Sequence, residues 1–166
     1  MKRIAVLDST TALRAKRLGD IGEALAEELL SQHGFVNTRN LNHVQRNFPF
    51  ADFFAERAAT RYVISVKIRN KYEFSCSGTP RLNRRYKLGS KSPQYASAAA
   101  AHFNAVPAWL AIALDTTSYC AYFGLVSDLN GSLGIDMSPT AVLAYECLAH
   151  EQPHAFQHAS LLNAYR

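Results

Sequence analysis

One segment limits the possible folds of this chain more than any other, the run Arg-Tyr-Val-Ile-Ser-Val-Lys-Ile-Arg at residues 61–69. Side chains alternate along it as they do in a β-strand with two different faces. One face carries Tyr62, Ile64, Val66 and Ile68, and the other carries Val63, Ser65, Lys67 and Arg69. We therefore expect a sheet with one apolar face, and with Ser65 and Lys67 together on the opposite face.

A helix is expected near the N-terminus. Apolar or small residues recur at helical spacing at Leu18, Ile21, Gly22, Leu25, Leu29 and Leu30. Thr10 or Thr11 can cap the start of this helix, and Gly34 can end it. Glu23 lies at the flank of the apolar stripe, so it is expected to point along the surface on which the helix packs.

The remaining pattern predicts strands and helices in mixed order. Strands are expected to start at 35–36 and to cover 50–55, 109–114 and 119–126; helices are expected at 93–104, 139–150 and 155–165; a turn is expected at 56–60, a basic loop at 70–92 and a short strand or ordered lead-in at 3–7. This order predicts an α/β fold with a mixed β-sheet flanked by helices. Residues 1–137 are expected to form the main domain, and residues 138–166 a C-terminal helical extension of it.

Composition narrows the function only slightly. The chain has 166 residues and a formal net charge of +5, which favours polyanionic partners but equally suits a mildly basic protein without any. Cys76, Cys120 and Cys147 are odd in number and widely spaced, which suits reduced thiols in a core better than disulfides or a metal site. No signal peptide or membrane span is evident, so we expect a cytoplasmic location and no membrane partner.

Asp52 interrupts an aromatic strand, where an isolated carboxylate is costly unless a cation accompanies it. If the strands around Asp52 and Lys67 form a hairpin, the two side chains converge at one end of the sheet, and Glu23 can join them from the helix. Two carboxylates suit a hard cation, which lowers the pKa of a bound water. The lysine can offset developing negative charge. This group predicts Mg²⁺-assisted phosphodiester hydrolysis.

Three runs of the sequence resemble the PD-(D/E)xK nuclease superfamily: GDIGEALAEELLSQHGF, PFADFF and YVISVKIRN. The resemblance is narrower to Holliday-junction-resolvase-type and YraN-type proteins. It continues through SPQYASAAAAHFNAVPAWLAIALD and AYFGLVSDL, and it covers roughly Leu18 to Leu129. It implies a restriction-endonuclease-like fold, DNA as partner, a homodimer and a divalent ion, Mg²⁺ or Mn²⁺. It also implies that Glu23 and Asp52 bind the metal and that Lys67 positions the water.

Ser65 departs from that family pattern, because the family has its second acid two residues before the lysine. Glu73 is the nearest downstream carboxylate, and Gln94 begins a helix without acids. Two interpretations stay open. In the first, an active nuclease uses Glu23, Asp52, Ser65 and Lys67, aided by Glu73 or Gln94. In the second, a degenerate member keeps the fold and binds DNA or a protein. A structural protein without a nucleic-acid role is a third possibility.

Two further patterns remain. Basic residues that can contact phosphate are Arg69, Arg81, Arg84, Arg85, Lys87 and Lys91, although most of them also suit a solvated loop. His150, His154 and His158 recur every four residues, as ligands on a helix would. Pro153 falls inside that repeat, so surface histidines are favoured over a metal site.

Overall fold

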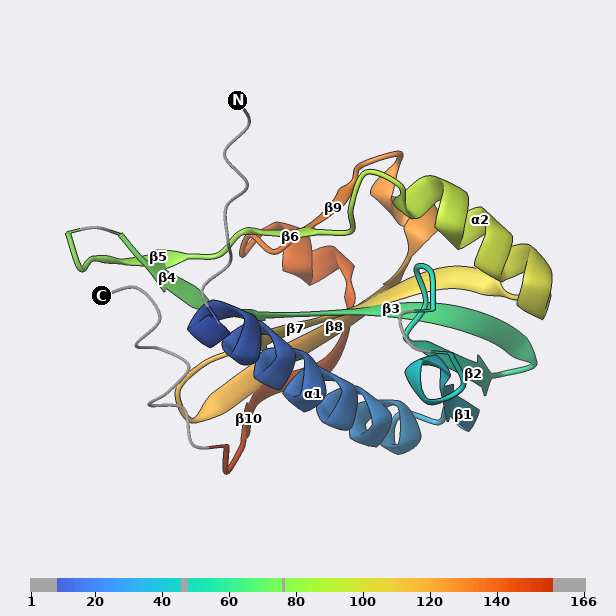
Figure 1. The fold of residues 1–166 in the computed structure, drawn as a ribbon, viewed down its shortest axis with the longest axis horizontal. Coiled ribbons are helices and arrows are strands. Elements are labelled where there is room, and N and C mark those ends of the chain that lie inside the picture. Colours follow the sequence, from blue (N-terminus) through green and yellow to red (C-terminus); the bar gives the residue numbers. More distant parts are fainter. Residues whose placement is uncertain (1–8, 46–47, 76, 157–166) are drawn as a thin grey trace.

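Six strands form the central sheet, in the spatial order β1-β2-β3-β7-β8-β10 (Figure 1). The computed structural model describes residues 9–45, 48–75 and 77–156. The strands are β1 Val36–Asn40, β2 Phe53–Arg57, β3 Thr60–Asn70, β7 Val106–Leu114, β8 Ser118–Leu125 and β10 Glu146–Pro153. β3 and β7 are parallel, and the other neighbours are antiparallel. The expected α/β fold with a mixed sheet is confirmed. The expected short strand at 3–7 lies outside the described residues.

Helix α1, Ser9–Gln32, covers one face of the sheet (Figure 1). Its buried residues Leu25, Ala26, Leu29 and Leu30 pack against the apolar side chains of β3 and β7, including Ile64 and Ile68. The approach is close at Gly22, where an added Cβ would lie 2.7 Å from Ile68 Cγ2 and 3.1 Å from Ile68 Cβ. Glycine at this position therefore lets α1 lie directly on β3, and it sets the depth of the neighbouring Glu23.

The opposite face is covered in two parts. Helix α2, Ser92–Phe103, packs over Val63 and Phe54 through Ala99. The remainder of this face carries Trp109, which lies in a second cluster with Tyr86 of the short strand β6, Arg85–Lys87, and Ile135 of the short strand β9, Gly134–Asp136. β6 and β9 pair with each other. Strand β3 therefore lies between α1 on one face and α2 with β6 on the other.

Residues 70–92, expected to be a loop, contain three short strands. β4, Tyr72–Phe74, and β5, Pro80–Leu82, form an antiparallel hairpin that projects beyond the central sheet, and β6 follows them (Figure 1). Each of these strands is three residues long, too short for an alternating pattern to show in the sequence. The β2–β3 turn is tighter than expected, since Arg57 pairs with Thr60 across Ala58 and Ala59, both at positive φ.

The predicted helix over 139–150 is wrong. Residues Ala141–Ala144 form only a 3-10 turn, and β10 then pairs along β8 as an edge strand of the central sheet. The register of β10 shifts twice, between Cys147 and Ala149 and between Ala149 and Gln152. Such irregularities remove the two-residue alternation and leave an apolar spacing that resembles a helix. The Glu146–Pro153 part of the predicted C-terminal extension therefore belongs to the sheet as a strand. The helix expected at 155–165 falls almost entirely outside the described residues.

An ion pair links two strands, β2 and β10, that lie in opposite halves of this sheet. Arg57, the last residue of β2, donates to both carboxylate oxygens of Glu146, the first residue of β10, at 2.6 and 2.8 Å. The guanidinium carbon lies 4.1 Å from the centroid of the Phe35 ring. The hydrogen bonds from Arg57 hold the pKa of Glu146 below its usual range. This contact anchors the first residue of β10. The sequence pattern does not reveal that Arg57 and Glu146 lie together.

Two glycines of α1 test its contact with β3. Gly19→Ala should raise the free energy of unfolding by about 0.5–1 kcal/mol, because alanine favours helix and nothing lies within 4 Å of the added Cβ. Gly22→Ala should instead lower it by about 1–3 kcal/mol, the usual cost of overpacking, because the Cβ overlaps Ile68. Urea denaturation measures both. Equal stabilisation by the two variants would show that α1 does not lie against Ile68.

Candidate active site

Asp52 lies at the point where β2 begins, and it continues the β2–β3 ladder with its side chain. Its backbone N–H donates to the Ile64 carbonyl at 2.8 Å, as a strand residue would. The next N–H of β3, that of Val66, donates to Asp52 Oδ2 at 2.7 Å. β3 runs on to Asn70, whereas its pairing with β2 stops at Ile64. A carboxylate thus occupies the place of a backbone carbonyl at the end of the ladder.

Glu23 and Asn42 reach the same place from other elements. The Asp52 carbonyl accepts from the Leu41 N–H at 2.8 Å, which anchors the 3-10 turn Leu41–His43 beside it. Asn42 Nδ2 then lies 2.9 Å from Glu23 Oε1 and 3.2 Å from Asp52 Oδ1. Asn40 Nδ2 donates to the second oxygen of Glu23 at 2.8 Å. The carboxylates of Glu23 and Asp52 therefore share a contact with one amide nitrogen.

Lys67 completes the predicted group. Burial raises the pKa of the Asp52 carboxyl, an effect opposed by the positive charge of Lys67 and by the hydrogen bond from Val66. Burial also lowers the pKa of the Lys67 ammonium, and the Asp52 charge opposes that change. Each group is thus easier to neutralise than it would be in water. The predicted convergence of Glu23, Asp52 and Lys67 is present in the structure.

These three residues line one open pocket of about 520 Å³, whose lining is partly polar and partly apolar. The other residues lining it are Asn42, Phe48, Phe50, Leu88, Gly89, Ser90, Lys91, Ser92 and Tyr95. A second pocket, of about 480 Å³, is lined mainly by apolar side chains, and it contains none of the residues predicted to be catalytic. The first pocket is therefore the candidate site, because it brings two carboxylates, those of Glu23 and Asp52, together with the Lys67 ammonium group. The second pocket has one carboxylate, that of Glu151, which is already paired with Lys71.

Ser65 does not join this pocket. Its side chain is 1% exposed, and its Oγ finds no hydrogen-bond partner among the described residues. Ser65 pairs with Trp109 across the β3–β7 ladder, in the interior of the sheet. A buried hydroxyl without a partner is costly. Ser65 therefore lies on the strand face expected for it, but not among the residues that line the pocket.

The predicted accessory and DNA-binding residues divide between two places. Lys91 lines the pocket, whereas Gln94 does not, although it follows in the same segment. Glu73 accepts from Asn83 Nδ2 at 2.8 Å on the β4–β5 hairpin and does not line the pocket. The other predicted basic residues are exposed on the end of β3, on β5, on β6 and just before β6: Arg69, Arg81, Arg84, Arg85 and Lys87.

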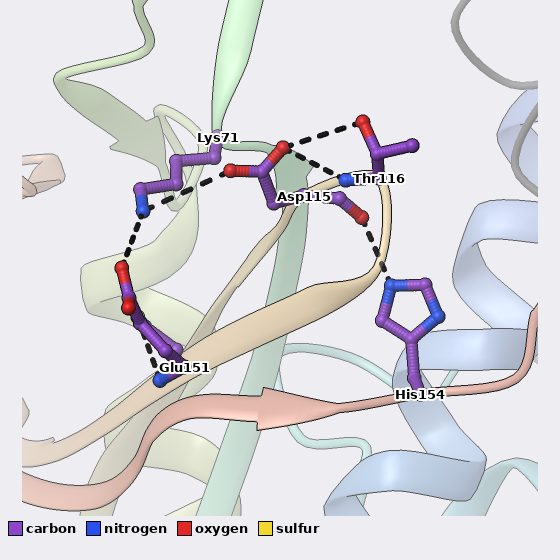
Figure 2. Close-up of polar contacts among 6 residues, drawn as sticks. Lys71, Asp115, Thr116, Glu151 and His154 are labelled. Atoms are coloured by element: carbon purple, nitrogen blue, oxygen red, sulfur yellow. Dashed lines mark hydrogen bonds and ion pairs between the residues drawn. The ribbon is translucent and has the colours of Figure 1, made fainter.

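The histidine repeat does not form a helical metal face. His150 and His154 lie on or next to strand β10, and His158 lies outside the described residues. Figure 2 shows the His154 ring directed at the Asp115 carbonyl, with Nε2 2.9 Å from that oxygen. His154 Nδ1 accepts from the Phe156 N–H at 3.2 Å, so the ring proton is on Nε2. His154 therefore contacts the backbone of the β7–β8 turn. At the same turn, the Lys71 ammonium group lies between the carboxylates of Asp115 and Glu151.

The cysteines were predicted to be core residues, and this is confirmed for one of them. Cys120 is buried, Cys147 is exposed, and Cys76 lies outside the described residues. Within the part of the chain that is described, no helix is long and apolar enough to cross a membrane.

Asn40 and Asn42 are the site residues that sequence reasoning missed. Asn40 is the last residue of β1 and Asn42 lies in the 3-10 turn that follows, in a polar stretch whose spacing does not point to β3. The alternation of asparagines at 40 and 42 is a weak signal, because asparagine is common in turns. The structure places this turn beside the carboxylates through the bond from the Leu41 N–H to the Asp52 carbonyl and through the side-chain contacts of Asn40 and Asn42.

Comparison with known proteins agrees with the fold. No protein-family model matches the chain, and no curated protein matches it. Among solved structures, the chain is similar to Hjc of Archaeoglobus fulgidus, a Holliday junction resolvase from an archaeal hyperthermophile. The TM-score is 0.56 at 18% sequence identity, and the match covers 78% of this chain and 96% of the other. This likeness shows that the fold is restriction-endonuclease-like.

The residues present suit a hard divalent ion. Glu23 and Asp52 both direct a carboxylate oxygen at a single polar hydrogen donor, so one cation could contact both. Burial raises the pKa of the Asp52 carboxyl and so disfavours its charged form. A bound metal ion would offset this cost of burying the carboxylate. Among the residues described, no group of three or more His, Cys, Asp and Glu side chains has metal-binding geometry. The carboxylates of Glu23 and Asp52 are therefore the charged metal ligands that this pocket offers.

The charge coupling between Asp52 and Lys67 gives a direct test of this geometry. Asp52→Asn should lower the pKa of Lys67 further, because it removes the carboxylate that favours the ammonium form while burial persists. Titration of the lysine side-chain NMR signals measures this change. Lys71, which pairs with Asp115 and Glu151, is an internal control and should titrate as before. An unchanged pKa of Lys67 in Asp52→Asn would show that the Asp52 carboxylate does not lie close enough to interact with the Lys67 ammonium group.

Proposed function

We propose that this protein is a metal-dependent endonuclease that cleaves DNA phosphodiester bonds at the Glu23–Asp52–Lys67 pocket. The observation that carries the proposal is the convergence of two carboxylates and the Lys67 ammonium group in a single pocket on a restriction-endonuclease-like fold. The similar solved structure is described as a Holliday junction resolvase, so branched DNA is the first substrate to test. Cutting a junction on two strands requires two sites, and a homodimer is part of the proposal.

Each residue has a distinct role in this proposal. Glu23 and Asp52 hold Mg²⁺ or Mn²⁺, and a divalent ion bound there would lower the pKa of its water and offset charge on the phosphate. Lys67 donates to the attacking water or to a phosphate oxygen. Its lowered pKa lets it lose a proton more readily than an exposed lysine does. Lys91, on the rim of the same pocket, is placed to contact a neighbouring phosphate.

The position of Ser65 favours a second candidate function. A buried serine supplies no charge to the pocket, and the described acids nearest in sequence after Lys67 do not line it. With one carboxylate fewer than the family pattern, a metal would bind more weakly. The alternative is therefore a catalytically degenerate module that binds DNA, or a protein partner, without cutting. Binding without metal-dependent cleavage would distinguish it from the nuclease.

The nuclease proposal predicts that supercoiled plasmid and a synthetic four-way junction are nicked in Mg²⁺ or Mn²⁺ and not in EDTA. Lys67→Ala should slow cleavage by about 10²–10³-fold, the usual effect of removing a donor that stabilises developing charge. Asp52→Ala should abolish it, because a metal ligand is removed. Gel assays of nicked and linear product measure both rates.

Lys16→Ala is the matched control for Lys67→Ala. Lys16 is an exposed lysine on α1 whose ion-pair partner is Asp20, also on α1, so its removal should leave cleavage unchanged. The enzyme proposal is wrong if the wild-type protein cuts no form of DNA in either metal, or if Asp52→Ala cuts as fast as wild type.

DNA contact by the basic segment around β6 has its own test. Replacing Arg84, Arg85 and Lys87 together by alanine should weaken DNA binding and flatten its salt dependence, by about 0.9 in slope for each phosphate that the protein no longer neutralises. Fluorescence anisotropy at several salt concentrations measures the slope. Lys16→Ala again serves as control. A slope identical to wild type would show that this segment does not contact the phosphates.

A further inference from the structure

The amide group of Asn42 occupies the point where the two site carboxylates meet. Its Nδ2 lies 2.9 Å from Glu23 Oε1 and 3.2 Å from Asp52 Oδ1. These oxygens come from α1 and from the residue preceding β2, two elements far apart in the sequence. One positively polarised group thus bridges both carboxylates, as a bound cation would.

The backbone, and not only the carboxylates, holds Asn42 in this position. Its N–H donates to Asn40 Oδ1 at 2.9 Å, which caps the 3-10 turn. The preceding residue, Leu41, is buried and donates its N–H to the Asp52 carbonyl. The side chain is therefore presented to the pocket before any ligand binds.

The pocket has only two carboxylates among its lining residues, those of Glu23 and Asp52. Ser65 is buried outside it, Glu73 does not line it, and α2 contains no acid that could supply a replacement. Asn42 carries an amide oxygen on the same terminal group as the bridging nitrogen. The terminal torsion of asparagine is soft, so exchanging the two atoms requires little movement. Amide carbonyl oxygens are ordinary ligands for hard divalent ions.

We propose that Asn42 is the third protein ligand of the divalent ion and supplies the oxygen that Ser65 does not. This inference rests on the proposed function, since it assumes that Glu23 and Asp52 hold the ion. In the ion-free protein the amide nitrogen bridges the carboxylates, and in the ion-bound protein the amide oxygen faces the ion. The third ligand is neutral, so the site binds its ion more weakly than one with three carboxylates.

A purely structural role for Asn42 predicts the opposite effect of its removal. If the amide serves only to hold the carboxylates together in the ion-free protein, it competes with the ion for the same oxygens. Its removal would then free both carboxylates and leave Mn²⁺ affinity unchanged or increased. If Asn42 is a ligand, its removal weakens Mn²⁺ binding.

The experiment measures Mn²⁺ binding to the full chain by calorimetry and by the electron paramagnetic resonance signal of free Mn²⁺. We expect Asn42→Ala to weaken binding by at least tenfold, within the range for altered metal surroundings. Asn42→Asp should bind more tightly than wild type, because it replaces a neutral oxygen with a charged one. Asn83→Ala is the matched control, because it removes another asparagine–carboxylate hydrogen bond, to Glu73, outside the pocket. Circular dichroism checks the fold of each variant.

The outcomes separate this inference from the proposed function. If wild type binds Mn²⁺ and Asp52→Ala does not, while Asn42→Ala binds as tightly as wild type or more tightly, the ligand role of Asn42 is overturned and the metal site stands. Binding by Asn42→Asp no tighter than by Asn42→Ala also overturns it. If wild type shows no Asp52-dependent Mn²⁺ binding, the metal site itself is wrong, and the inference fails with it.

Discussion

The hydrogen bond from the Val66 N–H to the Asp52 carboxylate organises the rest of the site. It ends the β2–β3 ladder with a side chain, so β3 continues beyond β2 and leaves room beside Lys67. The Asp52 backbone also pairs with Ile64 and with Leu41, which brings the turn carrying Asn42 to the same point. Gly22 lets α1 lie against Ile68 from the other face and places Glu23 within reach.

Burial makes this arrangement of charged groups costly. Burial disfavours the charged forms of both Asp52 and Lys67, although each is partly compensated by the other. Asn42 offsets part of the remaining cost by donating to both carboxylates. A protein selected only for stability would replace such a group with apolar side chains. Its presence in a pocket that Lys91 also lines, in the segment after β6, agrees with a role in binding a cation and a polyanion.

Sequence patterns predicted the parts of this protein that depend on regular periodicity. The alternation around Lys67 and the apolar stripe of α1 gave the central strand, the first helix and the convergence of Glu23, Asp52 and Lys67. The patterns failed at irregular strands. The bulges of β10 hide its alternation, and the three-residue strands around Arg81 and Lys87 are too short to show one. Asn42 and the burial of Ser65 depend on contacts between distant segments, which spacing does not encode.

The central claim is that Glu23, Asp52 and Asn42 converge on one divalent ion beside Lys67. Its most direct test is a crystal structure of the protein soaked in Mn²⁺, with anomalous diffraction recorded to locate the metal. We predict an anomalous peak in contact with oxygens of Glu23, Asp52 and Asn42, at the roughly 2.0–2.6 Å typical of hard divalent ions. A peak elsewhere, or none while Asn42 still bridges the two carboxylates, would contradict the account.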